Sequence, residues 1–214
     1  MKQYIKITTL WGREDKRPHN MIIGKFAKPE FELLKDVQWT FTEKVDGTNV
    51  RVMWDGNRVM FNGKTDNAQL PTPLFYKLEE LFMGQANEQK FEEMFGQDPV
   101  CLYGEGFGNK IQAVGKDYNP DGVDFVLFDV KVGDWWLERE NVVDIAEKLD
   151  IKVVPILLEG TLQEASDMVA KGFKSQYGDL TAEGLVGTPS TPLLNRKGER
   201  IITKIKHRDY EKLK

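Results

Sequence analysis

Short segments in which apolar and polar residues alternate restrict the possible folds of this chain more than any other feature. Residues 39 to 45, 49 to 54 and 58 to 61 alternate in this way, and Asp55-Gly56 between the last two is typical of a hairpin turn. Strands joined directly by such turns pair antiparallel, whereas parallel strands need a long crossover connection. We therefore predict an α+β fold of mainly antiparallel sheets flanked by helices, rather than a doubly wound parallel sheet.

Further elements follow from the same patterns. Period-two segments predict strands at residues 100 to 104, 124 to 130, 135 to 137, 152 to 158, 184 to 187 and 200 to 206. Apolar residues at helical spacing predict helices at residues 74 to 82, 142 to 149 and 162 to 169. Trp135 and Trp136 are assigned to packing.

Length and composition favour one domain spanning residues 1 to 214. A chain of 214 residues with 40% hydrophobic residues can bury a substantial core. No apolar run is long enough to cross a bilayer, and the first ten residues lack a secretory signal, so we expect a cytoplasmic protein with no membrane partner. The single cysteine, Cys101, excludes an internal disulfide and a metal cluster built on thiolates.

Charge is unevenly distributed along the chain. The formal net charge is -4, yet residues 1 to 28 hold seven Lys/Arg against two acids, and residues 197 to 214 hold seven against three. Such runs are often only solvated surface. Alternatively, both basic ends fold against one face and contact the phosphates of a nucleic acid.

Two glycine-containing segments resemble nucleotide-binding loops and fail on spacing. A P-loop ending at Asn62-Gly63-Lys64-Thr65 would need a glycine at position 58, which is Arg58. In Gly104-Glu105-Gly106-Phe107-Gly108 the third glycine comes one residue early for a dinucleotide-binding loop. With only two histidines in the chain, hydrolytic triads and zinc sites are poorly supported as well.

The segment Glu43-Lys44-Val45-Asp46-Gly47-Thr48-Asn49 stands where a predicted strand ends in a glycine turn. Taken alone, a lysine beside a turn is an ordinary surface residue. Four later segments change that interpretation: Leu102-Tyr103-Gly104-Glu105, Phe125-Val126-Leu127-Phe128-Asp129, Glu183-Gly184-Leu185-Val186 and Lys204-Ile205-Lys206. With Lys44-Val45-Asp46-Gly47 they resemble, in order, the motifs of the covalent nucleotidyltransferases, the superfamily of DNA ligases, RNA ligases and mRNA capping enzymes.

The resemblance implies that Lys44 is the nucleophile that takes AMP from ATP. A free lysine titrates near ~10.4, so at neutral pH its amine is protonated and cannot attack phosphorus. Nearby positive charge favours the neutral amine, and Lys204, Lys206 and a bound divalent cation are the candidates to supply it. The same charges would neutralise the triphosphate and its departing pyrophosphate.

The resemblance also implies roles for other residues. Glu105 would hold the ribose hydroxyls, Phe128 would stack on adenine, Glu43 would lie near the adenine edge, and Glu183 would orient a hydrated Mg²⁺. Taken singly, a core phenylalanine and solvated glutamates are the simpler interpretations.

Within the superfamily the chain looks most like the RNA-ligase-2 branch, because Glu43 precedes the nucleophile and Thr48-Asn49 follow it. Asp46 stands where that branch usually has histidine, and Lys64 stands where many relatives have an arginine that reaches the 5′-phosphate. A lysine is a point charge, whereas arginine is a bidentate fork. Only eight residues follow Lys206, so we expect no C-terminal OB-fold or helical domain.

We therefore predict an ATP-dependent RNA ligase that joins 3′-OH and 5′-phosphate ends through lysyl-AMP and uses ATP and Mg²⁺. The alternatives are a minimal ligase of nicked DNA or an RNA/DNA hybrid, a GTP-using capping enzyme, and a non-catalytic nucleic-acid-binding relative. The oligomeric state stays open.

Overall fold

The computed structural model describes residues 3–213, which form two compact units. Unit 1 contains residues 3 to 5 and 46 to 154, and unit 2 contains residues 6 to 45 and 155 to 213. The chain passes between the units at three peptide bonds, after Ile5, Val45 and Val154. Unit 2 is therefore built from two segments that are far apart in the sequence.

Unit 2 is organised around a five-stranded sheet with the order β1-β13-β12-β4-β11. The strands are β1 (Thr8–Thr9), β4 (Trp39–Lys44), β11 (Ile156–Gly160), β12 (Gly184–Pro189) and β13 (Thr203–Lys206). All neighbours pair antiparallel except β1 and β13, which are parallel. A separate antiparallel pair, β2 (Trp11–Arg13) and β3 (Met21–Phe26), completes the strands of this unit.

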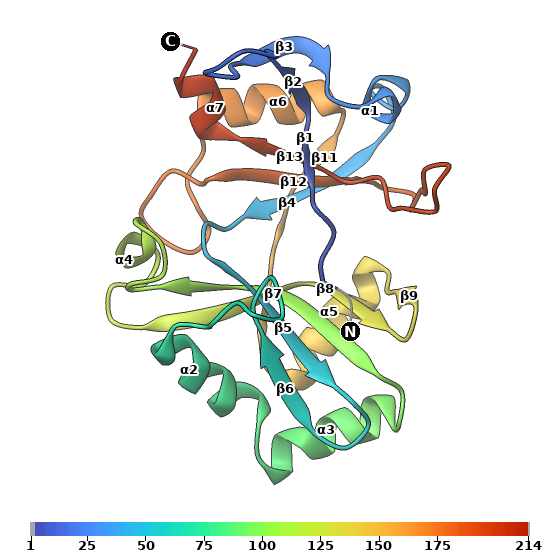
Figure 1. Ribbon diagram of the computed structural model, residues 1–214, viewed down its shortest axis with the longest axis vertical. Coiled ribbons are helices and arrows are strands. Elements are labelled where there is room, and N and C mark those ends of the chain that lie inside the picture. Colours follow the sequence, from blue (N-terminus) through green and yellow to red (C-terminus); the bar gives the residue numbers. More distant parts are fainter. Residues whose placement is uncertain (1–2, 214) are drawn as a thin grey trace. The chain divides into compact units, whose positions relative to one another are not determined.

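One face of this sheet carries the core of unit 2. Trp39 and Phe41 of β4 are fully buried there, together with Leu185 of β12. Helix α6 (Leu162–Lys171) and the short helices α1 (Pro29–Leu33) and α7 (His207–Glu211) pack against this core (Figure 1). Helix α6 begins at a capping box, in which the Thr161 hydroxyl and the Glu164 carboxylate satisfy each other's backbone N–H groups.

The two basic ends of the chain meet in unit 2. The indole N–H of Trp11 donates to Ser166 Oγ at 3.1 Å and to the Tyr210 hydroxyl at 3.0 Å, and Arg13 pairs with Asp209 at 2.6 Å. Counted over the sequence, residues 6 to 45 and 155 to 214 hold 18 Lys/Arg against 14 Asp/Glu. The rest of the chain, which includes unit 1, holds 12 against 20. Positive charge is thus concentrated in unit 2.

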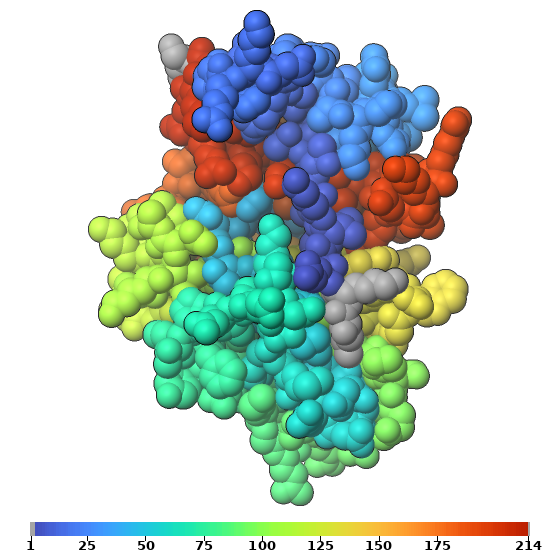
Figure 2. Space-filling view, viewed as in Figure 1, coloured from blue at the N-terminus to red at the C-terminus, as the bar shows by residue number. Residues whose placement is uncertain are grey.

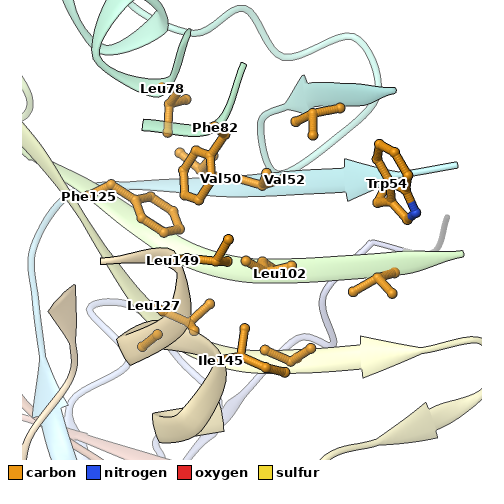
Figure 3. Packing of buried hydrophobic residues seen from close by; sticks show 14 of the residues in the cluster. Val50, Val52, Trp54, Leu78, Phe82, Leu102, Phe125, Leu127, Ile145 and Leu149 are labelled. Carbon is orange, nitrogen blue, oxygen red and sulfur yellow. The ribbon is translucent and has the colours of Figure 1, made fainter. Parts of the chain in front are cut away.

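Unit 1 is organised around a second, mainly antiparallel sheet with the order β10-β8-β7-β5-β6, and β9 pairs with β8. The strands are β5 (Thr48–Trp54), β6 (Val59–Asn62), β7 (Val100–Gly108), β8 (Val123–Val132), β9 (Trp135–Trp136) and β10 (Lys152–Val153). Helices α2 (Thr72–Phe82), α3 (Gln85–Phe95) and α5 (Arg139–Leu149) supply apolar residues to its core, and α4 (Gly115–Tyr118) follows β7. Figure 3 shows how Phe82 of α2 and Ile145 of α5 meet Val50, Leu102 and Leu127 of the sheet.

The predicted fold class is confirmed: the chain is α+β with mostly antiparallel sheets. Two corrections concern single elements. The segment predicted as one strand at residues 152 to 158 forms the two strands β10 and β11, which belong to different sheets. Trp136 packs against Tyr103, but Trp135 is 79% exposed, so its assignment to packing was wrong. Over the residues the structure describes, no helix has the length and apolar character needed to span a membrane.

Candidate active site

Lys44 is the last residue of β4 and lies on the face of the sheet away from the core. Side chains alternate along a strand, and Trp39 and Phe41 of β4 are buried on the opposite face. The pairing register places Lys44 beside Gly184 of β12, and Gly184 beside Lys206 of β13. The two lysines therefore occupy one row on the strands that flank β12.

Glu183, directly before β12, joins these two lysines. Lys44 Nζ donates to Glu183 Oε2, and Lys206 Nζ lies 2.6 Å from Glu183 Oε1. The three side chains are 21%, 14% and 9% exposed for Lys44, Lys206 and Glu183, respectively. Burial on its own would raise the pKa of the Glu183 carboxyl, but the ammonium groups of Lys44 and Lys206 outweigh burial and hold that pKa below its ordinary value. Glu183 is thus an ionised carboxylate at neutral pH.

Gly184, the residue after Glu183, allows β12 and β13 to approach each other closely. Its φ is +152°, and an added Cβ would lie 1.9 Å from the carbonyl oxygen of Ile205. A side chain at this position would therefore push β12 away from β13. The Glu183-Gly184 pair seen in the sequence has a steric reason.

Lys204 lies on the same sheet face as Lys206, because it is two residues earlier on β13. Its register partners are Val186 of β12 and Thr9 of β1. The structure thus places Lys204 one row further along the face than the Lys44–Lys206 row.

Glu43 lies on the other face of β4, and its side chain is 2% exposed. Ser175 Oγ donates to Glu43 Oε1, and the Gln176 backbone N–H donates to Oε2 at 2.9 Å. The carboxylate thereby fixes the segment between α6 and β12 to the strand that carries Lys44. Its predicted place near the adenine edge stays a prediction, and these contacts give it a structural role.

The turn that follows Lys44 belongs to unit 1, and the segment between β7 and β8 holds it. The Asp46 N–H donates to the Tyr118 hydroxyl at 3.1 Å, and Gln112 Nε2 donates to the Gly47 carbonyl at 3.0 Å. A Cβ on Gly47 would lie 2.3 Å from the carbonyl oxygen of Gly106, so only glycine allows this close approach. The glycine of the Lys-x-Asp-Gly motif is explained by packing on β7.

Asn49 and Glu105 are paired across β5 and β7 of unit 1. The Asn49 Oδ1 atom is buried, and within residues 3–213 it accepts no hydrogen bond. A buried amide oxygen without a donor carries a desolvation cost, so this position favours a ligand that brings a donor. The strand register thus brings together two of the residues predicted to bind nucleotide.

Phe128 lies at an irregularity of β8. The pairing passes from Tyr103–Asp129 to Gly104–Leu127, so Phe128 is the extra residue of a β-bulge. Because Phe128 follows Leu127 on the strand, its side chain is turned away from the core that contains Leu127. It packs edge-to-face on Tyr4 with ring centroids 5.0 Å apart, and the Tyr4 hydroxyl donates to Asp129 at 2.8 Å.

Lys64 is exposed in the loop after β6. Arg51, whose side chain is fully buried in β5, organises this loop: its Nε donates to the Gly63 carbonyl at 2.9 Å and its Nη2 pairs with Asp66 at 2.6 Å. The loop that presents Lys64 is therefore anchored on both sides of the lysine.

The comparisons with known proteins decide the family. A family model described as RNA ligase matches residues 37–206, a range that contains the segments around Lys44, Glu183 and Lys206. The chain belongs to the RNA ligase family. The predicted resemblance is thereby confirmed.

Solved structures of a relative support the fold. A ligand-free variant of Naegleria gruberi RNA ligase has 20% identity and a TM-score of 0.65, over 86% of this chain and 53% of that chain. A second variant, solved with ATP and Mn, has 20% identity and a TM-score of 0.66, over 99% of this chain and 63% of that chain. A third, also with ATP and Mn, has 20% identity and a TM-score of 0.64, over 100% and 65%. The present chain thus spans less than two thirds of the length of those chains. A comparison with curated protein sequences gave no match.

The chemistry of Glu183 fits the hydrated Mg²⁺ that the family implies. Within the described residues no three His, Cys, Asp or Glu side chains gather as a metal cage. Mg²⁺ needs no such cage, since it is held by one or two carboxylates together with water and substrate phosphates. Each oxygen of Glu183 accepts one lysine and retains a second lone pair.

Sequence reasoning missed three residues of this site: Arg51, Tyr118 and Ser175. Arg51 left one signal, a charged residue within the apolar run of β5. Tyr118 and Ser175 are 72 and 132 residues from their partners, and no local pattern marks them.

Proposed function

We propose that this chain is the adenylylation module of an ATP-dependent RNA ligase, with Lys44 as the nucleophile. The observation that carries the proposal is the row formed by Lys44, Glu183 and Lys206 on one sheet face. A buried carboxylate that bridges two lysines has a function at a site that must bind and release phosphates, whereas a purely structural site would gain more from apolar packing.

The first step forms a bond between Lys44 Nζ and the α-phosphorus of ATP and breaks the bond from that phosphorus to the bridging oxygen of pyrophosphate. Lys44 loses a proton, and pyrophosphate leaves with the electron pair. The adenylate is then passed to the 5′-phosphate of an RNA end, which frees the lysine. Attack by the 3′-OH of the second end forms the phosphodiester and releases AMP.

Glu183 holds Lys44 and Lys206 together before the nucleotide binds. Mg²⁺ bound through water at this carboxylate would supply charge neutralisation for the triphosphate. Lys206, released from Glu183, would then pair with a phosphate oxygen, and Lys204 would do the same one row along. Phosphoryl transfer depends mainly on such positioning and charge.

Residues of unit 1 are proposed to hold the nucleotide and the RNA end: Glu105 the ribose hydroxyls, Phe128 the adenine ring, Asn49 a group that donates a hydrogen bond, and Lys64 the 5′-phosphate. Support comes from the relative's structures, since Naegleria gruberi RNA ligase has been solved with ATP and Mn and with AMP and Mn. The roles of the individual residues rest on the motif order and on the register that pairs Asn49 with Glu105.

Both units together are proposed to act as one nucleotidyltransferase domain, because the nucleophile is the residue before Val45, where the chain passes from unit 2 to unit 1. RNA ends are the proposed substrate, whether at a nick or free, and nicked DNA is the next candidate. A cytoplasmic location fits the single buried cysteine, which needs no oxidising compartment.

The test is to incubate the purified protein with α-labelled ATP and Mg²⁺ and to look for labelled protein. Lys44→Ala is expected to abolish the label, while Lys35→Ala, a change at an exposed lysine of the same unit, retains it. An acid-labile label that persists in Lys44→Ala would place the nucleophile elsewhere.

A further inference from the structure

The connection between β12 and β13 forms a projecting hairpin in unit 2. Residues 190 to 200 leave the sheet, and an isolated antiparallel bridge pairs Leu194 with Arg200. Figure 2 shows this segment as orange-red atoms standing out at the right of the surface, and Figure 1 shows the same loop beyond β12. We define its tip as residues 194 to 199.

Asn195 organises the tip through hydrogen bonds to the backbone groups of the turn. Asn195 Oδ1 accepts the backbone N–H groups of Lys197 and Glu199, at 2.9 and 3.0 Å. Its backbone N–H donates to the Glu199 carbonyl at 2.8 Å, and its carbonyl accepts from Gly198 at 2.9 Å. Gly198, with a φ of +75°, completes the turn. Side chains on this tip are therefore presented from an ordered backbone.

Two cations on the tip are left without a neutralising acid. The one carboxylate of the tip, Glu199, accepts a hydrogen bond from Asn195 Nδ2 at 2.8 Å. Arg196 and Lys197 are exposed, and neither forms an ion pair with any residue from 3 to 213. Their charges remain available to an outside anion.

An apolar side chain stands next to these cations. Leu194 is 63% exposed, and the preceding Leu193 is 37% exposed. Cations beside an exposed apolar group match the sugar-phosphate backbone and base surface of a nucleic acid, which offers charge and apolar area side by side.

We propose that this tip is a contact for the sugar-phosphate backbone of the polynucleotide, with Arg196 and Lys197 on phosphates and Leu194 against a sugar or base. The inference rests on the proposed function, because it assumes a polynucleotide substrate. It agrees with the concentration of positive charge in unit 2.

The strand geometry limits how far from the reaction this contact lies. Lys206 comes eight positions after Gly198, and a strand rises about 3.3 Å per residue, so Gly198 of the tip is at most about 26 Å from the Lys206 row. At about 3.4 Å per nucleotide along one strand, that distance spans about eight nucleotides. An end of about eight nucleotides bound at the Lys206 row is therefore long enough to reach the tip, and we expect long ends to depend on this contact more than very short ones.

The experiment measures binding of fluorescent single-stranded RNA of about 20 and about four nucleotides by anisotropy over a range of salt concentrations. For Arg196→Ala/Lys197→Ala, loss of two phosphate contacts should lower the slope of log affinity against log salt by about 1.4 and weaken low-salt binding of the long RNA about tenfold. Binding of the short RNA should weaken less than binding of the long RNA. Leu194→Ser should weaken binding a few-fold without changing the slope, since no charge is lost.

The matched control is Lys35→Ala/Lys171→Ala, which removes an equal charge from two exposed residues of the same unit that lie outside both basic ends of the chain. Wild-type affinity and salt slope in the tip variant would overturn the inference, and so would an equal loss in the control, because the effect would then be one of net charge. Labelling of every variant with ATP is measured in parallel. Failed labelling of the wild type would instead count against the proposed function.

Discussion

Lys206 Nζ lies 2.6 Å from Glu183 Oε1, and this contact connects the last strand of the sheet to the carboxylate that also holds Lys44. Lys44 of the first motif and Lys206 of the last are more than 160 residues apart in the sequence, and both contact Glu183. Because both lysines lower the pKa of Glu183, the arrangement makes a prediction about pH.

The first prediction concerns stability and pH. A carboxyl whose pKa is depressed by folding stabilises the native state above its unfolded pKa, and this contribution is lost as the pH falls through the folded pKa. Glu183→Gln should therefore be less stable than the wild type at pH 7, by about 1–3 kcal/mol, and the difference should shrink in acid. Urea denaturation from pH 7 to pH 3 measures it. A difference that stays constant with pH would show that the charge of Glu183 contributes nothing to stability.

The second prediction separates the two lysines of β13. Lys204→Ala and Lys206→Ala should each slow labelling by ATP by orders of magnitude, because each would compensate charge on the triphosphate, and Lys204→Ala should be the slower. Single-turnover rates at saturating ATP measure the effect, with Lys35→Ala as the control. Rates near that of the wild type in both variants would leave these lysines as surface residues of the strand.

The third prediction concerns the turn after the nucleophile. Tyr118→Phe removes the hydroxyl that accepts the Asp46 N–H while it keeps the ring, which packs on Phe107 with centroids 5.8 Å apart. We expect a fall of about tenfold in the rate of labelling at saturating ATP with little change in KM, because the lysine's turn is held less firmly. The loss of stability should be about 1 kcal/mol.

Tyr76→Phe is the matched control for this variant, since Tyr76 is an exposed tyrosine of the same unit. A Tyr118→Phe enzyme that has only a lower Tm, and labels at the wild-type rate when kept cold, would reduce Tyr118 to a structural residue.

Much of this architecture was predictable because strand alternation and motif order are local properties of the sequence. The strands carrying Lys44, Glu105 and Lys206 were predicted within a few residues of their observed bounds. Helix α3 was missed, since among its residues only Phe91 is fully buried and no apolar stripe marks it. Strands β1 and β13 are nearly 200 residues apart in the sequence, and the local sequence of neither strand indicates that the two pair.

The orientation of individual side chains was less accessible to sequence reasoning. Glu43 and Lys44 are adjacent, so a strand must send them to opposite faces, and the hydroxyl of Ser175 that receives Glu43 comes from a segment without a motif. Phe128 takes the face opposite Leu127, as strand alternation predicts, but the bulge at this residue is set by the pairing of β7 with β8 and not by the residues of β8 alone.

The last prediction concerns the sugar at the junction. RNA is recognised by A-form geometry and by its 2′-hydroxyls, which DNA lacks, and Asn49 has a buried amide oxygen that accepts no donor from residues 3–213. We expect the enzyme to seal a nick with RNA on the 3′-OH side faster than an all-DNA nick. The measurement is a series of nicked duplexes at one low salt concentration, in which only the sugars beside the nick change. Equal or faster sealing of the all-DNA nick would contradict the RNA assignment and favour a DNA ligase, while the chemistry of Lys44 would stand, since AMP transfer to the lysine precedes any contact with the sugar.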